Sequence, residues 1–382
     1  MSVLLNTGIL GIGNQGNMVA ALANSRQVPI PVLGLNTSER DIDAVKSTTS
    51  IDCLYIGDGK GAGKDRTLSK EALKSYIESF MGDETFQKFI EPLDVVFIVS
   101  STGGGTGSGA SPMMADILRN FFKDKIFILV GTLPTIGESV GAQRNTIEYL
   151  VETERLEIPY MLFDNGNSTK SSTNDVYDQI NGDIVDAVCV IRGDYNLLSK
   201  YGMIDTQDMK KLITLPGLIH INLLKGIYQE KIPSDGSIED LIVASLKKNT
   251  MITPDRDKIV KRRGYIANLS EDIQPYFNKD FPKITEIYGE AAEVFDHYSV
   301  NDDDEKANYV VLINSGLSLP ENRLKSIQHR IEEVEEALKK KKESSILATL
   351  SEKVGIYDGT TARANEGKEV KKFDLGDILS KY

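Results

Sequence analysis

The sequence predicts an α/β protein: a parallel sheet covered by helices, followed by a smaller mixed α/β part. Two observations support this class. In the first half, short strands that are apolar throughout alternate with amphipathic helical stretches, as in parallel sheets with helices on both faces. Beyond about residue 215, strand-like and helical runs mix without that regular order. Because ligands of such sheets bind at the carboxyl ends of the strands, we expect a site there.

The elements are expected in the following order. Strands are predicted at 3–10, 32–36, 95–100, 125–133 and 160–165, with helices at 112–122 and 142–152. A long central helix is predicted at 173–194, because Val176, Ile180, Ile184, Val188 and Ile191 recur at helical spacing. After it come a helix at 238–249 and strands at 264–270 and 308–316.

A late helix is predicted at 320–343, with Leu324, Ile327, Ile331, Val334 and Leu338 along one seam. Packing on its own domain is favoured over a coiled coil, since the seam spans barely three heptads. Beyond 344 the chain is polar and is predicted to be a flexible tail, whose end "FDLGDILSKY" is either a docking peptide or a frayed end. The basic cluster Lys258–Arg263 is interpreted as a solvated turn rather than a contact surface.

Composition excludes several classes of protein. The 382 residues are 40% hydrophobic and 26% charged, which is typical of globular proteins and enough for two domains. A formal net charge of −12 argues against direct nucleic-acid binding. No apolar run approaches the roughly 18 residues of a membrane span, and the start does not resemble a signal peptide. With only two cysteines and three scattered histidines, we expect a cytoplasmic protein without a metal-ligand set, and no metal site is assigned.

The stretch Ser101–Ala110, "STGGGTGSGA", connects an apolar strand to an amphipathic helix. Glycine lets backbone N–H groups approach an anion closely, and the helix N-terminus adds a favourable dipole. A flexible linker fits poorly between a buried strand and a helix. The stretch therefore favours phosphate binding.

A second glycine loop, Gly11-x-Gly13-x-x-Gly16, follows the first strand. Alone it is a dinucleotide fingerprint, which keeps an NAD-dependent oxidoreductase open as an alternative. That class expects an acidic residue at the end of the second strand, where this chain has Asn36-Thr37-Ser38. A third stretch, "GDGKGAGKD" at 57–65, resembles a P-loop but lacks its first glycine and its Ser/Thr, so we interpret it as a loop near a terminal phosphate.

These motifs together resemble the tubulin/FtsZ superfamily of GTP-driven filament proteins. "GGGTGSG" is similar to the family's signature loop, "GIGNQGNMV" to its first glycine loop, and "LNTSE" and "GDGKGAGK" to its second and third loops. The resemblance implies a GTPase sheet domain, a central helix and an activation domain, with GTP or GDP and Mg²⁺ as cofactors. The implied phosphate-binding residues are Gly13, Asn14, Gln15, Gly16, Asn17, Gly103, Gly104, Gly105, Thr106 and Gly107.

The resemblance also implies the nucleoside contacts. "LPTIGESVGAQR" resembles the loop whose glutamate holds the ribose, here Glu138, with Arg144 nearby. "FDN" and "NDVY" supply Asn165 and Asn174, at positions that contact guanine in the family. Carboxamides match the donor and acceptor edge of that base.

"YGMIDTQDMKKLI" at 201–213 resembles the family's synergy loop, which implies catalytic roles for Asp205 and Asp208. The alternative is that Asp205 only caps the following helix, and the two roles are compatible. Within 100–112 there is no Asp, Glu or His, so the phosphate loops hold no obvious base. The family completes its site across a head-to-tail contact, with the aspartates of one subunit entering the pocket of the next.

Within the family, the chain looks most like the TubZ branch, which partitions plasmid or phage DNA. This implies a DNA-binding, TubR-like adaptor on the tail and no membrane partner. An FtsZ-like division or cytoskeletal GTPase, and a GTP-binding protein that assembles but barely hydrolyses, remain alternatives. The expected boundaries are a GTP-binding domain at 1–172, central helix and synergy loop at 173–214, activation domain at 215–319, late helix at 320–343 and tail at 344–382.

Overall fold

The computed structural model describes residues 4–343, except 198, 200–202, 234–235, 258, 278–279 and 302–307. Residues up to Ile331 form one compact unit, and a second unit begins at Glu332. The predicted tail at 344–382, with its candidate docking peptide, lies outside the described residues. The predicted domain boundaries stay predictions.

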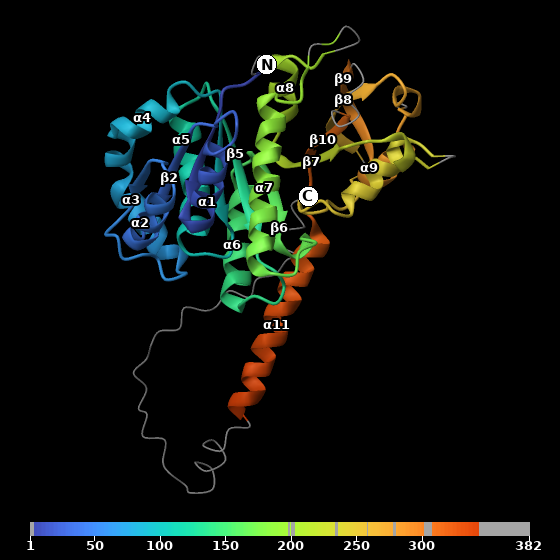
Figure 1. The fold of residues 1–382 in the computed structure, drawn as a ribbon. Coiled ribbons are helices and arrows are strands. Elements are labelled where there is room, and N and C mark those ends of the chain that lie inside the picture. Colours follow the sequence, from blue (N-terminus) through green and yellow to red (C-terminus); the bar gives the residue numbers. More distant parts are fainter. Residues whose placement is uncertain are drawn as a thin grey trace, which may run out of the picture. The chain divides into compact units, whose positions relative to one another are not determined.

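One sheet of ten strands runs through the first unit in the order β3-β2-β1-β4-β5-β6-β7-β10-β8-β9 (Figure 1). Neighbours from β3 to β7 are parallel, β10 is antiparallel to both β7 and β8, and β8 and β9 are parallel. This confirms the predicted fold class, a parallel sheet followed by a smaller mixed part. The strands are β1 Thr7–Ile12, β2 Val32–Asn36, β3 Cys53–Tyr55, β4 Val95–Ser101, β5 Ile126–Leu133, β6 Pro159–Asp164, β7 Gly217–Lys225, β8 Ile259–Ser270, β9 Glu290–Asn301 and β10 Tyr309–Leu317.

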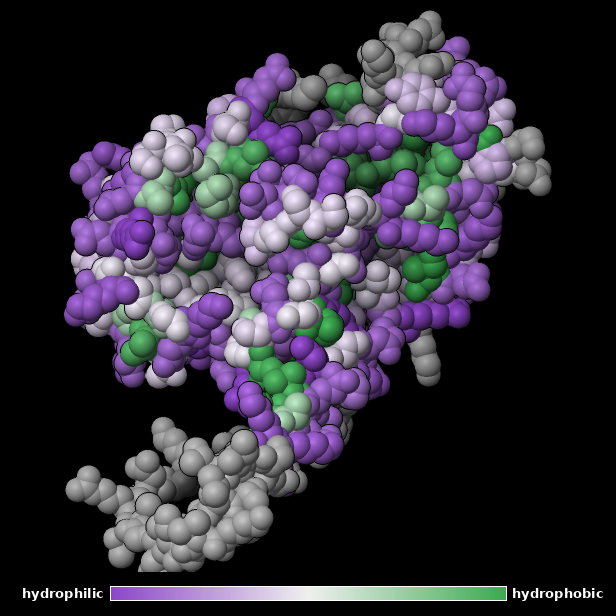
Figure 2. All heavy atoms as spheres, turned by 60° about the horizontal axis from the view of Figure 1, so that its bottom comes forward, coloured by the Kyte–Doolittle hydropathy of each residue, from purple (hydrophilic) through white to green (hydrophobic). Residues whose placement is uncertain are grey.

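Helices connect and cover these strands. The described helices are α1 Gly13–Asn24, α2 Glu39–Thr48, α3 Arg66–Gly82, α4 Glu84–Ile90, α5 Thr106–Phe121, α6 Val140–Arg155, α7 Thr173–Arg192, α8 Thr206–Ile213, α9 Ile238–Leu246, α10 Pro282–Tyr288 and α11 Glu321–Glu343, with short 3₁₀ turns η1 Asn165–Asn167, η2 Gln229–Lys231 and η3 Gln274–Tyr276. None of the described helices is long and apolar enough to span a membrane. Figure 2 shows a mainly hydrophilic face on which apolar residues form separate groups.

The central helix α7 runs between the parallel part of the sheet and the part from β7 to β9 (Figure 1). Its predicted stripe is buried at Ile180, Ile184, Val188 and Ile191, and Gly193 ends the helix in a left-handed conformation at φ 96°. An apolar stripe that packs on both sides explains why this helix was the clearest element in the sequence.

Several boundaries differ from the prediction. The first strand begins at Thr7 rather than residue 3, and α5 begins at Thr106, inside the glycine-rich stretch rather than at 112. The sequence reasoning missed β3, β7 and β9 and the helices α2, α3, α4 and α10. Strand β9 escaped because it forms the edge of the sheet and is largely polar, "EAAEVFDHYSVN", with many half-exposed positions.

The basic cluster is not a solvated turn, and that interpretation was wrong. Residues from Ile259 onward form β8, while Lys258 lies outside the described residues. Arg263 is buried, donating to Asn314 Oδ1 at 2.7 Å and to the Gly289 carbonyl at 2.9 Å. Arg262 pairs with Glu293 at 2.7 Å. Arg263 thus has the hydrogen-bond partners that burial of a guanidinium requires, and Arg262 links β8 to β9.

Helix α11 buries Leu324 and Ile327 within the first unit. This agrees with packing of its first turns on its own domain. In the second unit, Leu338 is 61% exposed.

Candidate nucleotide-binding site

A cavity of about 970 Å³ lies at the carboxyl ends of β1, β4 and β5 and beside the loop after β6. Ligands of parallel α/β sheets bind at these carboxyl ends of the strands. Its lining comes from both glycine loops, the loop at 61–64, the segment from Pro134 to Ala142, η1 and the first turns of α7.

Two helix N-termini meet at one end of the cavity. Helix α1 starts at Gly13 and α5 at Thr106, and neither has a side-chain cap or an acidic residue in its first turn. Gly13 adopts φ 78°, and a Cβ there would come within 3.1 Å of the Gly107 nitrogen. Two uncapped N-termini this close concentrate N–H groups and positive dipole on one point, which is an anion site.

The glycines of these loops serve different purposes. A Cβ on Gly16 would lie 2.2 Å from the Val99 carbonyl oxygen, and one on Gly107 would lie 2.9 Å from the Ile12 oxygen. These glycines allow α1 and α5 to pack tightly against the strands. A Cβ on Gly104 would meet nothing within 4 Å, although Gly104 lines the cavity. Packing within the chain therefore does not explain Gly104, whereas close approach of a ligand does.

Lys64 contributes the one cationic side chain among the described residues that line the cavity. It adopts φ 65°, which is unusual for a residue with a side chain. A Cβ on Gly105 would come within 2.7 Å of the Lys64 Cα, and Asn145 Nδ2 lies within hydrogen-bond distance of the carbonyl oxygens of Lys64, Gly103 and Gly104 (2.9–3.2 Å). Asn145 thus ties the Lys64 loop to the signature loop. Sequence reasoning considered 57–65 but did not single out Lys64.

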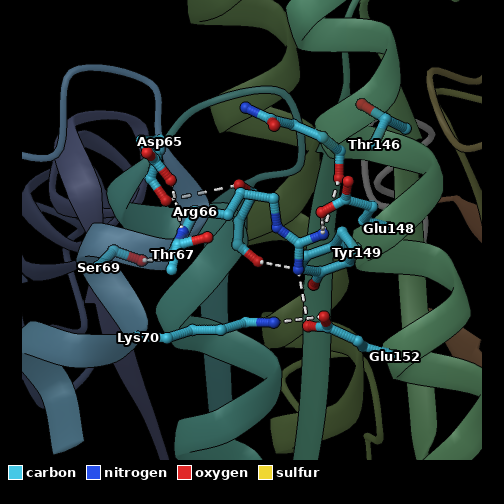
Figure 3. Close-up of polar contacts among 12 residues, drawn as sticks. Asp65, Arg66, Thr67, Ser69, Lys70, Thr146, Glu148, Tyr149 and Glu152 are labelled. Atoms are coloured by element: carbon cyan, nitrogen blue, oxygen red, sulfur yellow. Dashed lines mark hydrogen bonds and ion pairs between the residues drawn. The ribbon is translucent and has the colours of Figure 1, made fainter. Parts of the chain in front are cut away.

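Arg66 follows the Lys64 loop directly and anchors it through contacts to α5 and α6 (Figure 3). Its side chain is 4% exposed and donates to the Ser108 carbonyl at 3.0 Å, to Glu148 at 3.2 Å and to Glu152 at 2.7 Å. Lys70 also pairs with Glu152. A buried guanidinium with this many acceptors joins the start of α3 to α5 and α6, which makes the loop before α3 a fixed wall of the cavity.

Carboxamides and an aromatic ring line the opposite end of the cavity. Asn165 begins η1, while Asn174 and Tyr177 lie on the first turns of α7, and Tyr177 is 45% exposed. The buried Oδ1 of Asn165 and Oε1 of Gln15 have no hydrogen-bond partner within the described residues. Because a buried polar atom without a partner is costly, these atoms indicate a polar ligand. Sequence reasoning did not assign Tyr177 a role.

The described lining contains three acids and no histidine or cysteine. Asp41 accepts from Asn36 Nδ2 at 3.4 Å, Glu138 accepts from the Thr135 nitrogen at 2.9 Å, and Asp178 lies on α7. None belongs to the two helix N-termini that form the anion site. Beneath the sheet edge, burial raises the pKa of Tyr149, so this phenol stays protonated. The two helix N-termini themselves therefore supply no base, and Asp41 on the neighbouring α2 is an acid that also lines the cavity.

The structure brings most of the predicted site residues together around the cavity. The residues that line it are Gly13, Asn14, Gln15, Gly103, Gly104, Gly105, Thr106, Gly107, Glu138, Asn165 and Asn174. Gly16, Asn17 and Arg144 are not among the lining residues. Asn17 is buried and its Oδ1 accepts from the Leu35 nitrogen at 3.2 Å, which fixes β2 beside α1. Arg144 lies on α6.

Asp205 and Asp208 lie at the amino ends of the parallel strands, opposite the cavity. Thr206 donates to the Leu4 carbonyl at 3.2 Å, and Lys210 pairs with Asp94 at 3.3 Å, so α8 sits where β1 and β4 begin. Strand β4 has seven residues, and a strand of that length spans roughly 20 Å. The aspartates therefore cannot reach the cavity of their own chain.

Asp205 is also the N-cap of α8, as the alternative interpretation held. Its Oδ1 accepts from the nitrogens of Gln207 at 2.8 Å and Asp208 at 2.9 Å, and Asp208 completes a capping box. His297 of β9 contacts two described residues that precede Asp205: Nδ1 accepts from the Ile204 nitrogen at 3.2 Å, and Nε2 lies 2.8 Å from the Leu197 oxygen. Burial lowers the pKa of His297, which keeps the ring neutral for these contacts.

A parallel sheet with two glycine loops, two uncapped helix N-termini and carboxamides at one cavity defines a nucleotide-binding α/β protein. Comparison with known families makes this class specific. Residues 10–172 match the model of the Tubulin/FtsZ family, GTPase domain. This stretch, which is less than half of the chain, is therefore similar to the GTPase domain of the Tubulin/FtsZ family.

Individual relatives show which branches are similar. The chain is 28% identical over 187 residues to the tubulin-like protein CetZ of Pyrococcus horikoshii, covering 47% of this chain and 50% of CetZ. It is 27% identical over 191 residues to the tubulin-like protein TubZ of Clostridium botulinum C phage, covering 48% and 49%. These matches span about half the length of the curated relatives. A protofilament structure of TubZ from Bacillus thuringiensis serovar israelensis in its GTPγS form superposes with a TM-score of 0.74 at 17% identity, over 90% of this chain and 96% of that one.

Proposed function

We propose that this protein is a GTPase that assembles head to tail into filaments and hydrolyses GTP when the aspartates of one subunit enter the cavity of the next. One observation carries the proposal. The anion site lies where β1 and β4 end, and Asp205 lies where they begin, so a chain that stacks on a second copy brings the two together. The protofilament known for a structural relative supports this stacking.

We infer the following orientation for GTP. The triphosphate lies at the N-termini of α1 and α5, where N–H groups receive its charge, with Lys64 beside it. The base lies against Asn165 and Asn174, whose carboxamides offer both donors and acceptors, and Tyr177 offers a stacking face. Glu138, which also lines the cavity, would accept from the ribose.

Mg²⁺ fits this site as a companion of the nucleotide. The described residues hold no cluster of three His, Cys, Asp or Glu. The cavity instead offers separate oxygen donors at Asp41, Ser38 and Thr106, which suits an ion held mainly by phosphates and water. When bound, the ion neutralises phosphate charge.

The aspartates have the chemistry to act on water. In a stacked pair, Asp205 or Asp208 would orient or deprotonate the water that attacks the γ-phosphate, while the glycine-loop amides hold the phosphate oxygens. The isolated chain keeps these groups apart, so turnover depends on assembly. Such a contact is heterologous and does not close, and it therefore builds a filament.

We further propose that the filament segregates plasmid or phage DNA in the cytoplasm, through a DNA-binding, TubR-like adaptor held by the tail. The phage source of one TubZ relative supports this role, and the two buried, unpaired cysteines suit a reducing compartment. Direct nucleic-acid binding and membrane binding are not part of the proposal. Similarity to CetZ and FtsZ proteins makes a division or cytoskeletal filament the second candidate.

Light scattering against protein concentration, with Mg²⁺ and either GTP or GDP, tests the proposal. We expect a concentration threshold for assembly with GTP, and phosphate release only above it. Full turnover below the threshold would contradict the shared site. Binding of NAD instead of guanine nucleotide would replace the proposal with an oxidoreductase.

A further inference from the structure

The first turn of α11 places a guanidinium against the carboxamide end of the cavity. Arg323 Nε and Nη2 donate to the two carboxylate oxygens of Asp164, with Nη2 3.1 Å from Oδ1. Nη2 also donates to the Pro134 carbonyl at 2.7 Å. The two charged side chains are 14% and 5% exposed. A nearly buried, two-pronged pair of this kind is both strong and geometrically specific.

Both partners of Arg323 belong to segments that form the cavity wall. Asp164 ends β6, and its Oδ1 accepts from the Gly166 nitrogen at 2.8 Å, which caps the η1 turn that begins with Asn165. Pro134 lines the cavity and starts the segment that carries Glu138. One guanidinium therefore fixes the two wall segments on either side of a nucleoside.

Arg323 is itself held in position by the rest of the chain. Asp255 accepts from the Glu321 nitrogen at 2.6 Å and from Asn322 Nδ2 at 2.7 Å, which caps the start of α11. Leu324 and Ile327 anchor the same turns in the core. By contrast, Lys325 pairs with Glu321 on the exposed side of the helix.

We propose that Arg323 is a positioning residue for nucleoside recognition and that it couples α11 to occupancy of the cavity. This inference rests on the proposed binding of guanine nucleotide. Without Arg323, the Asp164 carboxylate would be buried without its cation, and the η1 turn would lose its fixed cap. Asn165 would then sample several positions, while the helix N-termini that hold the phosphates would stay in place.

Coupling between two sites is reciprocal. If α11 fixes the nucleoside wall, a bound nucleoside must stabilise the first turns of α11 by the same free energy. The stability of the first turns of α11, the helix that leads into the C-terminal part of the chain, therefore depends on whether a nucleotide is bound.

Binding measurements on the full chain test the inference. Arg323→Gln removes the charge at similar size, Arg323→Lys keeps the charge without the fork, and Lys325→Gln is the matched control on the same helix. Dissociation constants are measured for GTP, for ITP, which lacks the exocyclic amine of guanine, and for inorganic tripolyphosphate. We expect R323Q to weaken GTP binding by about tenfold or more. The preference for GTP over ITP should fall, tripolyphosphate binding should be unchanged, and R323K should recover part of the loss.

Hydrogen exchange supplies a second readout. GDP should slow exchange of the amides of 321–327 in the wild type and in K325Q, and not in R323Q. Wild-type GTP and ITP binding by R323Q, or an equal loss of tripolyphosphate binding, would overturn the inference. If R323Q does not fold, the same measurements are made on R323K. A wild-type preference for GTP over ITP in R323K would then overturn the inference. If the wild-type chain does not bind GTP, the proposed function is wrong as well. If the wild type binds GTP and R323Q binds it equally well, only the inference about Arg323 is wrong.

Discussion

The N-terminus of α8 differs from the N-termini of α1 and α5 in how its free backbone N–H groups are satisfied. Every helix start leaves backbone N–H groups without intrahelical partners. At α8 these groups are satisfied by Asp205 of the same chain, with Asp208 completing a capping box. At α1 and α5 no side chain does so, and the caps are Ile12 and Gly105.

The difference distinguishes a helix start that the chain satisfies itself, at α8, from two helix starts that form a ligand site, at α1 and α5. Helices α2, α3, α4, α6 and α7 all have a Ser or Asp side-chain cap. Helix α10 also lacks a cap from its own N-cap residue Phe281, but Glu239 accepts from its Ile284 nitrogen at 2.9 Å. The uncapped starts of α1 and α5, by contrast, meet at the cavity. The missing caps are therefore a feature of the site, because a capping side chain would occupy the place of a phosphate oxygen.

The largest expected effect comes from Asp205→Ala, which breaks the capped end. We predict that GTP turnover in assembled protein falls by at least about 100-fold, the scale of a lost general base. Nucleotide binding and filament formation should persist, with filaments that fail to disassemble. Loss of the cap alone costs about 1 kcal/mol of stability.

Asp83→Ala is the matched control for Asp205→Ala. Asp83 caps α4 and accepts from the nitrogens of Thr85 at 2.8 Å and Phe86 at 3.2 Å, much as Asp205 does for α8. Denaturant unfolding should show similar losses for both variants, and phosphate release should fall only in D205A. Equal turnover in the two variants would reduce Asp205 to a cap.

The next effect is expected at the uncapped end, from Gly104→Ala. A new Cβ meets no atom of the protein within 4 Å, so the fold should keep its stability. It projects where a phosphate would approach, and overpacking of about 1–3 kcal/mol weakens nucleotide binding roughly ten- to hundredfold. Isothermal titration calorimetry measures this change.

Gly182→Ala is the control, since Gly182 also has open space around it but lies in the interior of α7. It should gain up to about 1 kcal/mol of stability and leave binding unchanged. Unaltered binding in G104A would mean that no ligand approaches this backbone.

The uncapped end was predictable from the sequence because its signal is local. Strand, glycines and helix follow one another between residues 95 and 121, and each needs only its neighbours to be recognised. The start of α5 was misplaced because glycines and Pro112 disfavour a helix in general. Here the packing of Gly107 and Gly109 against neighbouring backbone overrides that preference.

Other parts of the site depend on contacts between distant segments. Lys64 matters because the sheet places its loop against Gly105, about forty residues later in the chain. The position of Asp205 opposite the cavity follows from the direction of the strands, which no motif encodes. Asn17 matched the family pattern, yet the structure gives it a hydrogen bond to β2 and no place in the cavity lining.

Lys64→Gln should have a smaller, selective effect. Because Lys64 is the one cationic side chain in the described lining, we predict about a tenfold loss of GTP affinity, as for a lost charged hydrogen bond. GDP affinity should change less, since Lys64 lies beside the proposed terminal phosphate. Lys60→Gln is the control: Lys60 is exposed and pairs with Asp58 at 2.8 Å. Equal losses for GTP and GDP would contradict a role at the terminal phosphate.

The smallest effect is expected at His297, which braces the capped end. Burial lowers its pKa in the folded state below the ordinary value of about 6.5, so the unfolded chain binds the proton more readily. Its stabilising contribution is therefore complete above about pH 6.5 and shrinks as the pH falls toward the folded pKa, by at most about 1.4 kcal/mol per pH unit.

His297→Gln should thus flatten the decline in unfolding free energy between pH 7 and pH 5, as measured by urea denaturation. His220, whose pKa burial lowers to about 3, contributes a similar slope that H297Q leaves intact. At pH 7, H297Q should also slow turnover about two- to fivefold, since Ile204, directly before Asp205, loses a hydrogen bond worth roughly 0.5–1 kcal/mol. An unchanged pH slope in H297Q would contradict a stabilising role for the neutral ring beside Ile204.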